Sequence, residues 1–134
     1  MADKAVSGGI EFARETQARV TLFTAVPEYR MPSEAQLLAH GVESIVDHTR
    51  RSRQLAGEIL AGAELRAKAA GLDVATDYAC SNQPWQAIID AARRNGCDAI
   101  FMGSHGRKGL AGLWHGSETR EVLRHSDIPT LVYR

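Results

Sequence analysis

The sequence lacks an excess of charge of either sign. Its 134 residues include 16 Lys and Arg against 16 Asp and Glu, so the formal net charge is zero. Proteins that bind nucleic acid or anionic membranes usually carry a basic excess, and we therefore expect neither partner. The run of Arg50, Arg51 and Arg53 could form a nucleic-acid patch, but a solvated helix face agrees better with the neutral balance.

Cysteine is scarce, and long apolar runs are missing. The two cysteines, Cys80 and Cys97, match neither a zinc motif nor a disulfide framework, so we expect two buried, reduced thiols. The longest apolar stretches, such as 20–26, are far shorter than the ~20 residues of a membrane span, and no basic-then-apolar leader opens the chain. These features predict a cytoplasmic protein.

Hydrophobic residues make up 44% of the chain and charged residues 24%, which is enough to bury one core. Helical and extended apolar periodicities alternate along it. Strands are predicted at 20–26, 74–79, 99–102 and 130–133, and the strand at 20–26 is expected to be buried. Helices are predicted at 5–18, 42–70, 84–95 and 117–125, with one helical turn after Ser33 in an otherwise irregular 27–39. Ser81 and Asn82 are the expected caps of the helix that begins at Pro84.

Alternating strands and helices favour parallel pairing, because a helical crossover returns the chain to a parallel neighbour. The predicted fold class is α/β, an open parallel sheet with helices on both faces. Such sheets bind ligands beyond the carboxyl ends of their strands. We expect Trp85 to pack against the core or its rim rather than stack on a ligand.

A glycine pattern follows the strand at 99–102. Gly103 and Gly106 are separated by two residues, and Gly116-Ser117 follows nine residues later at the start of a helix. Glycines let backbone N–H groups approach a phosphate, and a helix N-terminus attracts the same anion. The pattern is neither a P-loop nor the dinucleotide G-x-G-x-x-G. By itself it fits a turn followed by a capped helix equally well.

Together with 98–102 and Ile128-Pro129-Thr130-Leu131-Val132, this pattern resembles the ATP-binding branch of the universal stress protein family, which carries G-x2-G-x9-G-[ST]. The resemblance covers nearly the whole chain. It implies a Rossmann-like sheet with strand order three-two-one-four-five, and a homodimer formed through the C-terminal strand Thr130 to Tyr133. It also implies ATP or a related adenine nucleotide as cofactor, with Mg²⁺ as a candidate companion.

The resemblance assigns the nucleotide contacts residue by residue. Val26 matches the place beside adenine, and the phosphate loops match the remaining residues. These are Met102, Gly103, His105 and Gly106 in the first loop, and Gly116, Ser117, Glu118 and Thr119 in the second. His115 fits a surface residue better than a ligand contact.

Catalytic and metal residues are not predicted, because no assembled nucleophile, base and orienting group can be read from the sequence. We therefore expect a stress-response regulatory or sensor module rather than an enzyme, with slow ATP hydrolysis left open. The alternative is a dimeric interaction protein whose nucleotide site is vestigial.

The chain departs from the family in two ways. It has no counterpart of the first strand and its Asp-Gly-Ser turn, so 1–134 reads as a single, N-terminally incomplete domain. That strand is central, and without it 20–26 and 99–102 would face each other across roughly 9.6 Å, two strand spacings. Either the segment is missing from the chain or another chain or segment fills the slot. Glu118 would also repel a triphosphate, unless Mg²⁺ bridges the charges.

Overall fold

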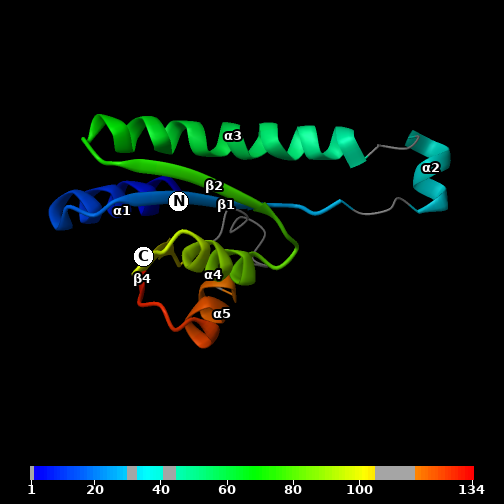
Figure 1. The fold of residues 1–134 in the computed structure, drawn as a ribbon. Coiled ribbons are helices and arrows are strands. Elements are labelled where there is room, and N and C mark those ends of the chain that lie inside the picture. The colour runs from blue at the N-terminus through cyan, green and yellow to red at the C-terminus, as the bar shows by residue number, and fades with distance from the viewer. Residues whose placement is uncertain (1, 30–32, 41–44, 105–116) are drawn as a thin grey trace.

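The computed structural model describes residues 2–29, 33–40, 45–104 and 117–134. Helices and strands alternate along most of the chain (Figure 1). The helices are α1 (Ala2–Thr16), α2 (Glu34–His40), α3 (Ile45–Ala69), α4 (Pro84–Arg94) and α5 (Ser117–His125). The strands are β1 (Val20–Val26), β2 (Val74–Cys80), β3 (Ile100–Gly103) and β4 (Thr130–Tyr133).

The predicted elements are present, with small shifts at their ends. The helical turn expected after Ser33 is the seven-residue helix α2. Gly71 and Gly96 follow α3 and α4 with positive φ angles of 80° and 64°, a conformation that glycine adopts without a Cβ clash. Gln83, rather than Ser81 or Asn82, is the N-cap residue of α4, because its carbonyl accepts the first hydrogen bonds, from the Gln86 and Ala87 N–H groups. The Ser81 hydroxyl accepts a hydrogen bond from the Gln83 N–H, and Asn82 pairs with Glu28.

The strands pair in parallel, but the described residues form two sheets instead of the single open sheet that we predicted. β1 pairs with β2 from Val20–Val74 to Val26–Cys80, and β3 pairs with β4 from Ile100–Thr130 to Gly103–Tyr133. The division falls between β1 and β3, where the family resemblance places a further strand. β1 is accordingly less buried than predicted, since Val26 is its only fully buried residue.

Helices cover the sheets from two sides. α3 lies along β1 and β2, whereas α4 and α5 lie together on the other side in Figure 1. The core cluster consists of Ile89 and Ala92 from α4, Ile100 from β3 and Val122 from α5. Because Ile89 and Ala92 are three residues apart on α4, they share one face of the helix and bury it against the other two residues.

The first turns of α3 extend beyond the sheet. Its 25 residues span about 37 Å, whereas the seven-residue strands beside it span about 23 Å. Ile45 and Val46 are consequently exposed, whereas Ala56, Leu60, Ala63 and Ala67 farther along the helix are buried.

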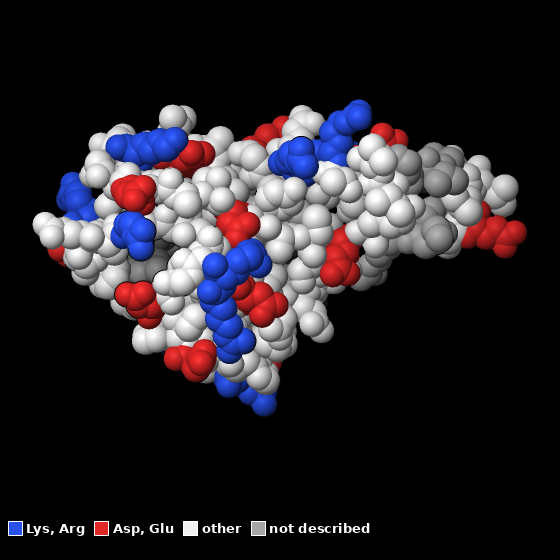
Figure 2. Space-filling view, viewed as in Figure 1, with Lys and Arg blue, Asp and Glu red and all other residues white. Residues whose placement is uncertain are grey.

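Some of the remaining predictions from the sequence agree with the structure, and others do not. Arg50, Arg51 and Arg53 are exposed, and the visible face of the molecule intersperses acidic and basic side chains (Figure 2). Cys80 and Cys97 are free thiols as expected, but neither is buried as predicted, because Cys80 is exposed and Cys97 is only partly buried. The helices of the described chain include none that is long and apolar enough to cross a membrane.

Candidate functional site

The carboxyl ends of β1 and β3 carry three of the predicted site residues. Val26 ends β1 with 1% of its surface exposed, and its carbonyl accepts a hydrogen bond from the Ser81 N–H at 2.8 Å. Met102 and Gly103 end β3 and are partly buried. β1 and β3 run in the same direction, so these residues lie at corresponding ends of the two sheets.

The shared direction follows from α1. Gly8 lies against the Tyr133 ring at the end of β4, whereas Phe12 lies against Phe101 near the start of β3, with ring centroids 6.0 Å apart. α1 is therefore antiparallel to β3. Three residues then connect Thr16 to Val20, so β1 reverses the direction of α1 and is parallel to β3.

The first turn of α5 is held at the end of β3 by a buried side chain. The Thr119 hydroxyl donates a hydrogen bond to the Gly103 carbonyl at 2.9 Å, and Thr119 is only 7% exposed. The N–H groups at the start of a helix have no hydrogen-bond partners within that helix. The amides of Ser117 and its neighbours, which begin α5, therefore lie at this edge of the sheet. The structure thus brings together Gly103 and the predicted residues of the α5 first turn.

Glu118 performs a role that the sequence analysis missed. Its Oε2 atom accepts a hydrogen bond from the Trp85 N–H at 2.7 Å, although the two residues are 33 positions apart. Trp85 is the second residue of α4, whose N-cap residue Gln83 makes no side-chain capping bond. The carboxylate therefore caps α4 and complements the positive end of its dipole. No local sequence signal identifies this contact, because the partners come from different helices.

Trp85 packs as predicted. It lies against the core cluster, and its ring stacks on His125 with centroids 4.6 Å apart. Three predicted site residues, His105, Gly106 and Gly116, lie outside the described residues, as does His115.

An ionic cluster lies away from these residues, between β2 and α4. Asp77 accepts hydrogen bonds from Arg94 at 2.6 Å and from Asn95 at 2.9 Å. Burial raises the pKa of Asp77, but the bonds from Arg94, Asn95 and the Tyr78 N–H, together with the guanidinium charge, outweigh it and leave the pKa below its usual range. This cluster connects α4 and the residue that follows it to the first sheet.

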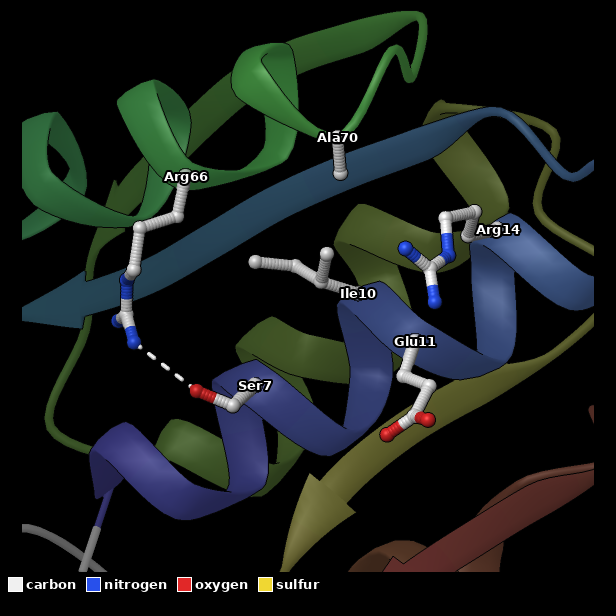
Figure 3. Close-up of a pocket in the computed structure, with 6 residues that line it drawn as sticks. All are labelled: Ser7, Ile10, Glu11, Arg14, Arg66 and Ala70. Carbon is white, nitrogen blue, oxygen red and sulfur yellow. Dashed lines mark hydrogen bonds between the residues drawn. The ribbon is translucent and has the colours of Figure 1, made fainter.

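A cavity of about 370 Å³ lies between α1 and the end of α3 (Figure 3). Ser7, Ile10, Glu11 and Arg14 line it from α1, and the Arg66 guanidinium donates a hydrogen bond to the Ser7 hydroxyl at 3.1 Å. Those predicted nucleotide contacts that the structure describes are not among its lining residues. Within the described ranges, His, Cys, Asp and Glu side chains form no cluster suited to a metal ion.

The comparisons with known proteins identify the family. The model of the universal stress protein family matches residues 1–134, and the chain belongs to this family. A universal stress protein of Bacillus subtilis, YxiE, is 27% identical over 136 residues, which cover 100% of this chain and 91% of the relative.

Solved structures share the fold. A universal stress protein in complex with cAMP has a TM-score of 0.60 and 24% identity, and the match covers 98% of this chain and 85% of that one. A universal stress protein from Archaeoglobus fulgidus in complex with dAMP has a TM-score of 0.64 and 18% identity, with coverage of 99% and 87%. Both structures contain an adenine nucleotide.

Proposed function

We propose that this protein binds ATP or a related adenine nucleotide at the carboxyl ends of β1 and β3 and acts as a stress-response regulatory or sensor module. The observation that carries the proposal is the Thr119–Gly103 hydrogen bond, because it fixes the first turn of α5 at the end of β3. The glycine motif connects these two elements in the sequence. The adenine nucleotides in the two related structures agree with it.

The proposed contacts follow from the chemistry of each residue. The amides of Ser117, Glu118 and Thr119 face the polyphosphate at the positive end of the α5 dipole, and the Ser117 hydroxyl donates to a phosphate oxygen. Met102, Gly103, His105, Gly106 and Gly116 are the other proposed phosphate contacts, and Val26 is the proposed contact of adenine.

Glu118 is compatible with this arrangement. Its carboxylate bonds the Trp85 N–H, so the negative charge is directed at the N-terminus of α4 and is partly neutralised there. Repulsion of the triphosphate is then weaker than the sequence alone suggests, and the binding of ATP does not require a Mg²⁺ ion at Glu118.

Calorimetric titration of the protein with ATP, in the presence and absence of Mg²⁺, tests the proposal. Ser117→Asp adds a carboxylate at the proposed phosphate site and should weaken binding by about tenfold or more. Ser33→Asp is the matched control, because it makes the same change at the start of α2, where the Ser33 hydroxyl accepts a hydrogen bond from the Gln36 N–H. Equal affinities for the two variants, or no binding heat in the folded protein, would contradict the proposal.

A second candidate is a dimeric interaction protein with a vestigial nucleotide site. β4 pairs with β3 along one edge, and Val132 and Tyr133 are each 38% exposed. An exposed strand edge invites pairing with another chain. We propose a homodimer through Thr130 to Tyr133, which sedimentation at micromolar concentration tests: a dimer lost on Val132→Lys supports it, and a monomer refutes it.

A dimer that binds no adenine nucleotide would favour this second candidate. Rapid phosphate release would instead indicate an enzyme, which we do not propose. The cytoplasmic location stays a prediction from the sequence.

A further inference from the structure

The cavity between α1 and the end of α3 is built from one face of each helix (Figure 3). Its four lining residues on α1, from Ser7 to Arg14, recur at the three- and four-residue steps that bring side chains to one side of a helix. Arg66 and Ala70 are four residues apart and line it from the end of α3. The volume of about 370 Å³ is large enough for a small organic ligand.

This cavity is separate from the proposed nucleotide contacts. Arg14 lies near the end of α1 and Ala70 directly follows α3, so the cavity extends toward the amino ends of β1 and β2. The proposed contacts Val26 and Gly103 lie at the carboxyl ends of β1 and β3. A ligand in the cavity would therefore be a second one, and its binding does not depend on the proposed function.

The Arg66 guanidinium crosses the cavity from α3 to α1. It donates a hydrogen bond to the Ser7 hydroxyl at 3.1 Å and another to Asp3 at 3.4 Å. The Asp3 side chain is 91% exposed, so solvent weakens this ion pair. A guanidinium has five N–H donors in a planar fork that matches a carboxylate. Arg66 therefore retains donors for a bound anion.

Two opposite charges line the cavity without pairing with each other. Glu11 and Arg14 are three residues apart on α1, a spacing at which a carboxylate and a guanidinium can pair. Neither side chain makes an ion pair or a hydrogen bond with any residue that the structure describes. The cavity thus presents a cation and an anion that a ligand carrying both charges can satisfy together.

The remaining two lining residues are apolar. Ile10 and Ala70 are both partly buried, and Figure 3 shows them between the two helices. They provide a surface for an aliphatic group beside the charged side chains. Lysine, the other cation that commonly binds anions, is not among the lining residues.

We propose that this cavity binds a small aliphatic amino acid in its zwitterionic form. The carboxylate of the ligand accepts hydrogen bonds from Arg14 and Arg66, and its ammonium group donates to Glu11. The aliphatic side chain of the ligand contacts Ile10 and Ala70. A phosphate fits this set of residues less well, because the Glu11 carboxylate repels a second negative charge.

Titration of the protein with L-valine, followed by NMR of the backbone amides, tests the site. The charged lining residues are exposed and screened by solvent, so we expect a dissociation constant of about 1 to 10 mM. The shifts should saturate and concentrate at residues 7–14 and 66–70. Shifts that do not saturate by about 50 mM would refute the site.

Three further ligands separate the two charges of the zwitterion. Isovalerate lacks the ammonium group and isobutylamine lacks the carboxylate, and each should bind at least about fivefold more weakly than L-valine. Equal affinity of L-valine and isovalerate would refute the contact with Glu11. Inorganic phosphate that binds as tightly as L-valine would reduce the cavity to a non-specific anion site and would also overturn the proposal.

Three substitutions of exposed residues complete the test. Arg14→Gln and Glu11→Gln should each weaken the binding of L-valine by about tenfold. Arg53→Gln is the control, because it removes the same charge from α3 at a position 13 residues, or about 20 Å, before Arg66. It should change the affinity by less than about twofold, and an equal loss in all three variants would overturn the proposal. The comparison of ligands on the unchanged protein decides the matter if a variant does not fold.

Discussion

Removal of the Glu118 carboxylate should destabilise the protein through a helix other than its own. A hydrogen bond to a charged group contributes about 1.5 to 3 kcal/mol, and a carboxylate at a helix N-terminus adds about 0.3 to 1 kcal/mol. Because Glu118 is only partly buried, we expect Glu118→Ala to lower the free energy of unfolding by about 2 kcal/mol. For a chain of this length, that loss corresponds to a fall in Tm of about 6 to 10 °C.

Glu118→Gln keeps an oxygen acceptor but removes the charge, so it should cost about half as much. Glu121→Ala is the control on the same helix: it removes bonds to the exposed Arg124 and His125, and surface pairs of this kind contribute less than about 1 kcal/mol. Thermal and urea unfolding measure the stabilities, and the amide resonance of Trp85 in an NMR spectrum reports the bond itself.

The reasoning would be refuted if Glu118→Ala were as stable as Glu121→Ala, or if the Trp85 amide resonance did not move. The same variants separate capping from charge repulsion. If the carboxylate serves α4, Glu118→Gln should change the affinity for ATP by less than about threefold, whereas a carboxylate facing the triphosphate would make Glu118→Gln bind at least about tenfold more tightly.

Asp77→Asn should flatten the acid side of the profile of unfolding free energy against pH, measured by urea titration. The folded-state pKa of Asp77 lies below its unfolded value. The stabilisation from Asp77 is therefore present above the unfolded pKa and is lost as the pH falls through the folded pKa, between about pH 5 and pH 2. Gly8→Ala should lower the unfolding free energy by about 1 to 3 kcal/mol, because a Cβ there would lie 2.7 Å from the Tyr133 ring. Gly62→Ala, with nothing within 4 Å of the new Cβ, should instead raise it by about 0.5 to 1 kcal/mol, and a fall would contradict the helix assignment. Ile89→Ala, at a site 1% exposed, should cost about 2 to 5 kcal/mol by urea denaturation, and a loss below 1 kcal/mol would mean that this core is loosely packed.

Local patterns in the sequence determined most of the secondary structure. The strands at Val20–Val26 and Thr130–Tyr133 and the helix at Ser117–His125 have the predicted bounds. Hydrophobic periodicity and helix-ending glycines act over a few residues, so they can be read along the chain without knowledge of its fold.

Contacts between distant segments were decided only by the tertiary structure. Glu118 is 33 positions from Trp85, and Thr119 is 16 positions from Gly103. The sequence specifies neither side-chain bond. The exposure of Ile45 likewise depends on how far α3 extends past the ends of the strands beside it. The division of the described strands into two sheets likewise depends on which strands pair, and pairing is a property of the folded chain.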